Sequence, residues 1–153
     1  MEKRQPMGIE LVKRGIVTED DIEKALDYQK THSNKKIGDI LNILGLCDPN
    51  ILVNAVGDIL GEKAIYLLEK DIRVDVLEYV SLDLVKQNKA VPFEIGSGKI
   101  KVCFADTSNR RSVEVIRLLL LNKGLVMEKY ITFESNIEKI IDSLEGNTSG
   151  DID

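Results

Sequence analysis

The first sixty residues of the chain carry one sequence pattern twice, with equivalent positions thirty residues apart. From Met7 the sequence reads MGIELVKRGI, and from Ile37 it reads IGDILNILGL. The matching pairs are Gly8 and Gly38, Leu11 and Leu41, Gly15 and Gly45, Ile22 and Leu52, Ala25 and Ala55, and Leu26 and Val56. A repeat of this period indicates duplicated supersecondary units that share one core. Two similar halves of this kind can build one pseudo-symmetric site between them.

Each copy of the pattern predicts two helices joined by a turn. In the first copy an apolar helical face runs through 7–12, and Gly15 stands where a left-handed cap would end that helix. Thr18 then precedes the acidic run 19–21. A hydroxyl cap followed by carboxylates favours a helix start because both satisfy or complement the free amide groups there. This second helix is expected to continue to Gln29.

The second copy follows the same rules. Its apolar face runs through 37–44 and stops at Gly45, and Asp48 followed by Pro49 is a favourable helix start. The next helix carries the apolar residues of 52–59, and the polar segment 30–36 connects the copies. We therefore predict an all-helical first part with four helices in two helix-turn-helix pairs.

After Gly61 the pattern changes to that of an α+β unit. Strand-like segments lie at 90–95, 99–105 and 126–133, and helical segments at 110–122 and 135–144. They are preceded by an apolar run at 64–68, interpreted as a strand or buried extended segment, and by two short helices at 75–80 and 82–87. The predicted fold is α+β, with a tandem helical repeat over 1–62, a small α/β subdomain over 63–145, and a flexible tail or linker over 146–153.

The composition narrows the class of function. The chain has 153 residues and a net charge of −5, and an acidic protein is poorly suited to neutralise nucleic-acid phosphates, so no nucleic-acid binding is expected. No apolar run approaches the length that spans a bilayer, and the N-terminus has no signal-peptide core, so we expect a cytoplasmic protein without direct membrane insertion. Cys47 and Cys103 stand in apolar surroundings and are expected to be free thiols.

The sequence contains no pattern that indicates catalysis. The run Gly96-Ser97-Gly98-Lys99 has part of a phosphate-loop pattern, but Phe93 and Ile100 occupy the positions that need Gly and Ser or Thr. We predict a hairpin turn there. The single histidine, His32, has no partners at metal-ligand spacing, so we expect no metal site, and no nucleophile–base pair is visible.

Two functions remain open for the repeat on physical grounds. Glycine lets a ligand approach the backbone closely, and free amides at helix starts attract phosphate, so a ligand site between the copies is one possibility. The other is a helical bundle that only docks another protein. DNA binding by helix-turn-helix pairs is disfavoured because the second helix opens with the carboxylates of 19–21 and not with basic residues.

The repeated pattern is similar to that of a known family. The order Leu-Gly-x-x-Leu-Val-x-x-Gly-Ile-x-Thr, continued to a final Ala-Leu-x-x-Gln, resembles the N-terminal domains of assembly ATPases of type IV pili and type II secretion. The first copy matches over 7–29 and the second more loosely over 37–60. Segments 90–92 and 105–109 resemble the α/β subdomain of the same family, so the resemblance covers about residues 4–145.

Through this resemblance, the chain is expected to bind the second messenger cyclic di-GMP. Domains with the tandem motif (MshEN-type domains) are receptors for this ligand, and a two-fold symmetric ligand suits a duplicated motif. The resemblance implies that glycines approach the ligand, that apolar residues pack on guanine and ribose, and that Gln29, Asp39 and Asp106 contribute polar contacts. The implied ligand-binding residues are Arg4, Met7, Gly8, Leu11, Val12, Gly15, Gln29, Lys36, Ile37, Gly38, Asp39, Leu41, Asn42, Gly45 and Asp106.

The resemblance also implies a place for the chain within a larger machine. It would be the regulatory N-terminal region of an assembly ATPase, would not hydrolyse ATP itself, and would be held at the inner face of the membrane by the ATPase core and inner-membrane assembly proteins. The family's leading Arg position is Pro6 in the first copy and Lys36 in the second, and Ile59 stands at the second Gln position. Arg can bind a phosphate with two hydrogen bonds from its planar guanidinium group, whereas Lys supplies only a point charge. The alternative is therefore a protein-docking domain that has lost nucleotide binding.

Overall fold

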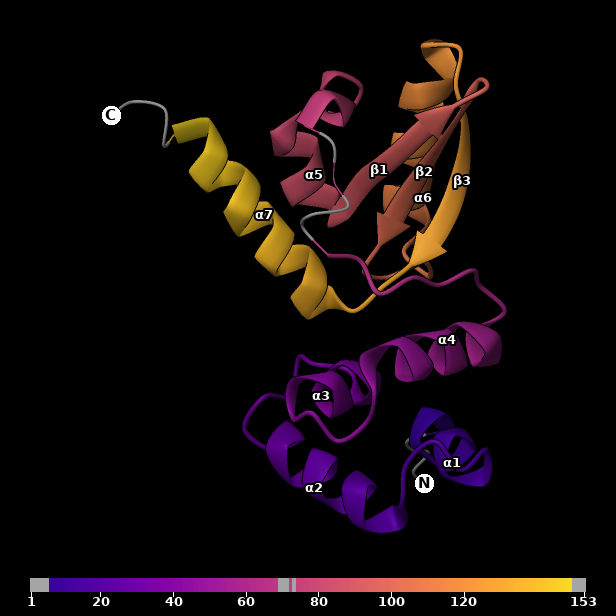
Figure 1. Cartoon of the computed structure of the whole chain (residues 1–153), viewed down its shortest axis with the longest axis vertical. Helices are drawn as coiled ribbons and strands as arrows, with labels where there is room; N and C mark the ends of the chain where they lie inside the picture. The colour runs from indigo at the N-terminus through magenta and orange to yellow at the C-terminus, as the bar shows by residue number, and fades with distance from the viewer. Residues whose placement is uncertain (1–5, 69–71, 73, 150–153) are drawn as a thin grey trace. The chain divides into compact units, whose positions relative to one another are not determined.

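The computed structural model describes residues 6–68, 72 and 74–149, and the chain divides into two compact units, 1–66 and 67–153 (Figure 1). The first unit is helical and contains both copies of the repeat. The second unit contains a small sheet with helices. The predicted α+β class is confirmed.

The first unit consists of two helix pairs that share one apolar core. Its helices are α1 (Pro6–Lys13), α2 (Glu19–Gln29), α3 (Ile37–Ile43) and α4 (Pro49–Leu60). Helix α3 packs against each of the other three, and α1 also packs against α4. The residues most completely buried between them include Leu11, Ala25, Ile40, Leu41 and Leu52, each with 0% of its surface exposed. The four predicted helices are therefore confirmed.

Both copies end their first helix in the same way. Gly15 and Gly45 have left-handed φ angles of 72° and 68°. In the first copy the N–H of Gly15 donates to Val12 O (2.9 Å) and the N–H of Ile16 to Leu11 O (3.0 Å). The equivalent bonds of the second copy run from Gly45 to Asn42 (3.1 Å) and from Leu46 to Leu41 (3.2 Å). This is the Schellman arrangement, which satisfies the last carbonyls of a helix and needs glycine at the left-handed position.

The second helix of each copy has a side-chain cap at its start. Thr18 Oγ1 accepts from the N–H of Asp21 (3.1 Å), and Asp21 Oδ2 accepts from the N–H of Thr18 (3.0 Å), which is a capping box. Asp48 Oδ1 accepts from the N–H groups of Asn50 and Ile51 at the start of α4. The predicted helix starts are confirmed at both places.

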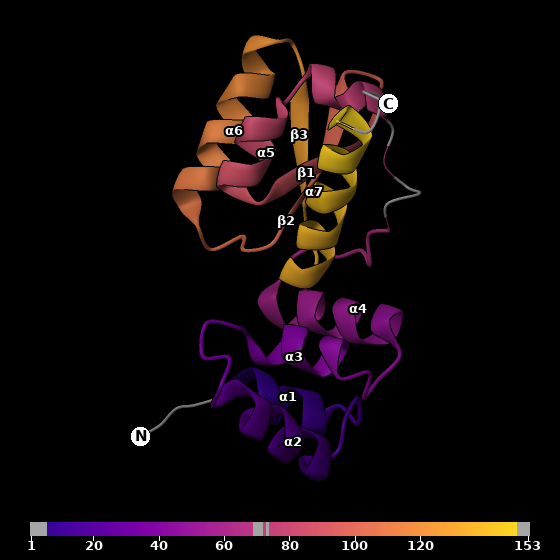
Figure 2. The same cartoon turned by 90° about the vertical axis from the view of Figure 1, so that its left-hand side faces the viewer.

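The second unit is built on a three-stranded sheet in the order β1-β2-β3. The strands are β1 (Ala90–Gly96), β2 (Lys99–Phe104) and β3 (Val126–Ile131). Strands β1 and β2 are antiparallel, and β2 and β3 are parallel because α6 (Arg110–Asn122) crosses over between them. Helix α7 (Glu134–Ser149) lies on the other side of the sheet from α6 (Figure 2). Helix α5 (Leu82–Asn88) packs against α7 and β1, and the 3-10 helix η2 (Val74–Glu78) packs against β1.

The glycine-rich run at 96–99 is a hairpin turn, as predicted. Gly96 pairs with Lys99 across the turn, and the central residues Ser97 and Gly98 have φ angles of 55° and 76°. Positive φ at both central positions is characteristic of the type I′ turn, whose twist matches that of the flanking strands.

The structure differs from the sequence prediction at three segments of the second half. Helix α7 extends to Ser149, so the predicted tail over 146–153 is wrong for 146–149; residues 150–153 lie outside the described part. Of the two alternatives predicted for 64–68, the strand is not formed: the segment has an isolated bridge at Ala64 and no further strand or helix, and Leu67 within it is buried. The first of the two predicted short helices is the 3-10 helix η2.

Candidate functional site

A hollow of about 510 Å³ lies between α1 and α2 in the first copy of the repeat. Two residues that the sequence predicted to contact a ligand, Gly8 and Val12, line it. The other lining residues are Ile9, Lys13, Glu19, Ile22, Glu23 and Leu26. A concave site of this volume falls within the usual range for small-molecule pockets.

The lining of this hollow, which we call the α1–α2 hollow, combines an apolar base with charged groups. Ile9 is 57% exposed, whereas Val12, Ile22 and Leu26 are half-buried. Lys13 is exposed, and its Nζ lies 3.9 Å from a carboxylate oxygen of Glu10, a solvent-screened pair. Such a surface can pack on a flat ring while a cation faces an anion and the carboxylates of α2 face hydrogen-bond donors.

Sequence reasoning missed most of the α2 side of the hollow. Glu19 and Glu23 are four residues apart, and so are Ile22 and Leu26. All four side chains therefore lie on one side of α2. The sequence shows this spacing, but it predicts only a helix-start role for Glu19 and a continuation of the helix for Ile22 and Leu26.

In the second copy, the residues equivalent to the α2 side of the hollow are buried. The positions that correspond to Ile22, Glu23 and Leu26 are Leu52, Val53 and Val56, whose exposed fractions are 0%, 1% and 9%. Asp39, which corresponds to Ile9, is only 5% exposed. The two copies therefore share their helix ends but differ in the exposure of these equivalent side chains, which are accessible in the first copy and buried in the second.

The predicted ligand-binding residues fall into two groups in the structure. Those with accessible side chains or backbone are Met7, Val12, Gly15, Gln29, Lys36, Asn42 and Gly45. Those that are buried are Gly8, Leu11, Ile37, Gly38, Asp39 and Leu41. Leu11 and Leu41 have no exposed surface, so in this conformation they belong to the core and offer no face to a ligand. Gly8 and Gly38 lie inside helices, whereas Gly15 and Gly45 end them.

Two of the predicted polar residues, Gln29 and Asp106, form hydrogen bonds within their own unit. Gln29 Nε2 donates to the carbonyl oxygen of Lys35, within the connector between the copies. Asp106 belongs to the second unit, and its Oδ1 accepts from the N–H (2.9 Å) and the hydroxyl (2.6 Å) of Ser108 in the turn before α6. Arg4 lies outside the described residues.

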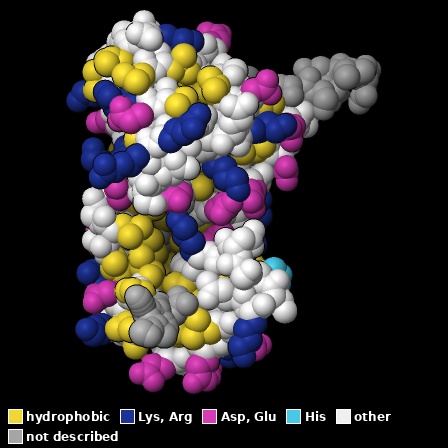
Figure 3. All heavy atoms as spheres, turned by 180° about the vertical axis from the view of Figure 1, so that it is seen from behind, with side chains coloured by type: hydrophobic (Ala, Val, Ile, Leu, Met, Phe, Trp, Pro, Cys, Tyr) yellow, Lys and Arg dark blue, Asp and Glu magenta, His cyan; other side chains and the backbone are white. Residues whose placement is uncertain are grey.

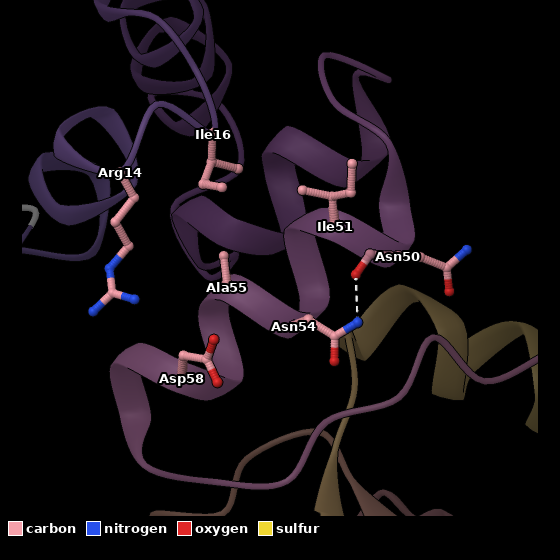
Figure 4. Close-up of a pocket in the computed structure, with 7 residues that line it drawn as sticks. All are labelled: Arg14, Ile16, Asn50, Ile51, Asn54, Ala55 and Asp58. Atoms are coloured by element: carbon pink, nitrogen blue, oxygen red, sulfur yellow. Dashed lines mark hydrogen bonds between the residues drawn. The ribbon is translucent and has the colours of Figure 1, made fainter.

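A second hollow, of about 430 Å³, lies between helix α4 and the turn that follows α1 (Figure 4). Arg14 and Ile16 line it from the first copy, and Asn50, Ile51, Asn54, Ala55 and Asp58 line it from α4. Asn54 Nδ2 donates to the backbone carbonyl of Asn50 (2.8 Å), so this amide is already engaged within its own helix. None of the predicted binding residues that the structure describes lines this hollow.

The described residues provide no cluster with metal-ligand or nucleophile chemistry. No group of three or more His, Cys, Asp or Glu in this part of the chain is arranged to hold a metal ion. Burial raises the pKa of the Cys103 thiol, and partial burial together with the carboxylates of Asp48 and Asp21 raises that of Cys47. Both thiols are therefore poor nucleophiles at neutral pH. His32 stacks on Tyr28, with ring centroids 3.9 Å apart.

The sequence profile of the MshEN domain matches residues 60–151, which is more than half of the chain. The chain belongs to the MshEN domain family. The matched region of this MshEN domain begins at the end of α4 and covers the α/β unit, whereas the tandem repeat precedes it. The family resemblance predicted from the sequence is thus confirmed.

Two solved structures have the same fold as this MshEN domain. A structure of MshE "with cdg" (cyclic di-GMP) has a TM-score of 0.60 and 22% sequence identity, and the match covers 92% of this chain and 99% of that chain. The N-terminal domain of XpsE has a TM-score of 0.53 and 19% identity, over 93% of this chain and 97% of that chain. At these identities the likeness shows the fold alone.

No curated protein matches the chain. None of the described helices has the length and apolar character needed to cross a bilayer.

Proposed function

We propose that this MshEN domain is the regulatory N-terminal domain of a pilus or secretion assembly ATPase and that it binds cyclic di-GMP through its tandem repeat. The observation that carries the proposal is the α1–α2 hollow, an accessible concave surface within a duplicated helix pair. The structure of MshE "with cdg" supports the same ligand for a protein of this fold.

The chemistry of the α1–α2 hollow suits one guanosine half of the ligand. Ile9, Val12 and Leu26 supply apolar surface for the base and ribose. Lys13 supplies a cation for the phosphate, and Glu19 and Glu23 supply acceptors for the N–H groups at the guanine edge. The family's leading Arg is Pro6 in this copy, so Lys13 takes over the charge that the motif otherwise places before the glycine.

The proposal assigns the buried residues a supporting role. Leu11, Leu41 and the helix-ending glycines hold the two helix pairs in matching geometry, and Gln29 fixes the connector between them. Direct ligand contacts come from the accessible residues of the first copy, and Lys36 at the start of α3 is the accessible cation of the second copy. The ATPase core lies outside this chain, and the domain acts on it without hydrolysing nucleotide itself.

Amide hydrogen exchange with and without cyclic di-GMP tests the location of this site. We expect slower exchange in α1 and α2 when the ligand is present and no change in β1–β3. The Val12→Glu variant places a carboxylate in the hollow and should weaken binding at least tenfold, whereas Ile51→Glu makes a similar aliphatic-to-Glu change on α4 and should bind normally. Equal effects of the two variants, or protection confined to the second unit, would contradict the proposed site.

A second candidate is a docking domain that has lost the nucleotide. The burial of Leu52 and Val53 favours it, because these side chains offer no surface to the other half of a symmetric ligand in this conformation. Under this candidate, a large excess of cyclic di-GMP would leave both hydrogen exchange and the melting temperature of the chain unchanged.

A further inference from the structure

Helix α6 is apolar on its outer side as well as on its buried side. Ile116 and Leu120 face the sheet and have 0% of their surface exposed. On the outer side Val115, Leu118 and Leu121 are 40%, 49% and 48% exposed. Helix α6 therefore has a narrow exposed apolar stripe between charged residues in addition to the apolar face that it buries against the sheet.

The three outer residues form one continuous stripe, which we call the α6 outer face (Val115, Leu118 and Leu121). Their spacing of three residues places successive side chains next to one another on the helix surface. Single exposed apolar residues are ordinary on protein surfaces, but contiguous apolar patches rimmed by charges mark sites of interaction. In the upper part of Figure 3, which views the second unit from behind, hydrophobic side chains lie among Lys and Arg side chains.

The charges around this stripe are of one dominant sign. Residues 110–123 carry four cations, Arg110, Arg111, Arg117 and Lys123, and one carboxylate, Glu114, in a chain whose net charge is −5. Arg117 is engaged by Glu114 through two hydrogen bonds of 3.0 and 2.7 Å. That pair lowers the pKa of Glu114, so the carboxylate stays ionised.

The two arginines at the start of α6 are placed against the usual electrostatic preference. Arg110 and Arg111 occupy the first turn, where the helix dipole favours anions, and that turn contains no acidic residue. Both side chains are exposed, and neither forms an ion pair with any described residue. Their charge is thus available to a group outside the described part of the chain.

We propose that the α6 outer face docks an acidic amphipathic helix of a partner protein. Leucine anchors on such a helix would cover Leu118 and Leu121, and its carboxylates would meet Arg110 and Arg111, whereas Lys123 Nζ already donates to the carbonyl oxygen of Glu78 (3.5 Å). Complementary charge of this kind selects partners and speeds their encounter. A second copy of this chain is disfavoured, because a two-fold pairing through α6 would bring the same positive charges together. This interface is independent of cyclic di-GMP binding by the first unit.

A designed peptide tests the proposal directly. The probe is a fluorescein-labelled helical peptide of about 18 residues, long enough to form a helix on binding, with Leu along one face and Glu flanking it. Matched peptides carry Lys at every Glu position or Gln at every Leu position. Fluorescence anisotropy with the full chain should show saturable binding of the acidic peptide and no binding of the other two.

Variants of the chain assign the binding to α6. Leu118→Gln and Arg111→Glu should each lower the affinity of the chain for the acidic peptide by about tenfold. Leu60→Gln is the matched control, because Leu60 at the end of α4 is also 49% exposed, and it should bind as the wild type does. Circular dichroism should show the same helix content for all three variants, since the substituted residues are exposed.

Four results would overturn the proposal. They are the absence of saturable binding of the acidic peptide, equal binding of the Lys peptide, equal losses for Leu118→Gln and Leu60→Gln, and a dimer in sedimentation that Leu118→Gln disperses. The last result would assign the α6 outer face to contacts between copies of this chain.

Discussion

Gln29 Nε2 donates a hydrogen bond of 2.8 Å to the carbonyl oxygen of Lys35. Gln29 is the last residue of α2, and Lys35 lies in the connector just before α3. This one side chain therefore ties the end of the first copy to the connector just before the second.

Replacing Gln29 with Glu should weaken this connection. The carboxylate has no N–H to donate and would face the carbonyl of Lys35, so we expect the free energy of unfolding to fall by about 1–3 kcal/mol. Urea unfolding followed by circular dichroism measures the change. Gln87→Glu on the exposed side of α5 is the control and should stay within about 0.5 kcal/mol. The same loss in both variants would argue against a connecting role for Gln29.

Gly57 allows the chain to fold back closely onto α4. A Cβ at this position would lie 2.6 Å from the Cβ of Ala64 and 2.8 Å from the carbonyl oxygen of Glu62. Gly57→Ala should therefore lower the free energy of unfolding by about 1–3 kcal/mol, as overpacking does. Gly146→Ala in α7 meets open space and should raise it by up to about 1 kcal/mol, because alanine favours the helix. A stabilised Gly57→Ala would show that this segment is not packed against α4.

Asn136 holds the first residue of the second unit. Its side chain is 6% exposed, and its Nδ2 donates to the carbonyl oxygen of Leu67 at 2.7 Å. Asn136→Ala leaves that buried carbonyl unsatisfied and should cost about 1–3 kcal/mol of unfolding free energy. Asn54→Ala removes a similar bond to a backbone carbonyl on the surface, so it should cost less than about 0.5 kcal/mol. Thermal unfolding of the two variants compares buried and exposed bonds, and equal shifts would contradict the burial argument.

Two threonines should respond in opposite ways to replacement by valine. Thr132 is 3% exposed, and its Oγ1 has no hydrogen-bond partner among the described residues. Its neighbour Cys103 is a neutral thiol, because burial raises the pKa of that group, and a thiol is only a weak donor or acceptor. Thr132→Val should leave stability unchanged or raise it by about 1 kcal/mol, because valine keeps the shape and removes an unsatisfied hydroxyl. Thr18→Val breaks the capping box of α2 and should cost about 1–2 kcal/mol. If Thr132→Val were the more harmful change, its hydroxyl would have a partner in solution.

The helices, the hairpin and the helix ends could be predicted from the sequence because each depends on neighbours in the chain. Gly15 and Gly45 end helices through bonds that span a few residues, and Thr18 caps α2 within its own first turn. The sequence predicts the end of the last helix at residue 144, but α7 continues to Ser149. Gly146 does not have the left-handed φ that ends α1 at Gly15, so the helix passes through it.

The surface of the candidate site could not be predicted in the same way. Ile22 and Leu52 occupy equivalent positions in the repeat, yet Ile22 lines an open hollow and Leu52 is fully buried. Which of two equivalent residues faces solvent depends on how the four helices cover one another, and that is a property of tertiary packing. For the same reason Leu11 and Leu41 match the motif of a binding site but are core residues in this structure.

Calorimetric titration of the purified chain with cyclic di-GMP tests the central claim most directly, with GTP and ATP as controls. We predict saturable binding at micromolar or lower concentration, close to one ligand per chain, without heat from the controls. The absence of binding heat and of thermal stabilisation at a large excess of cyclic di-GMP would contradict the proposed function and favour a domain that docks proteins only.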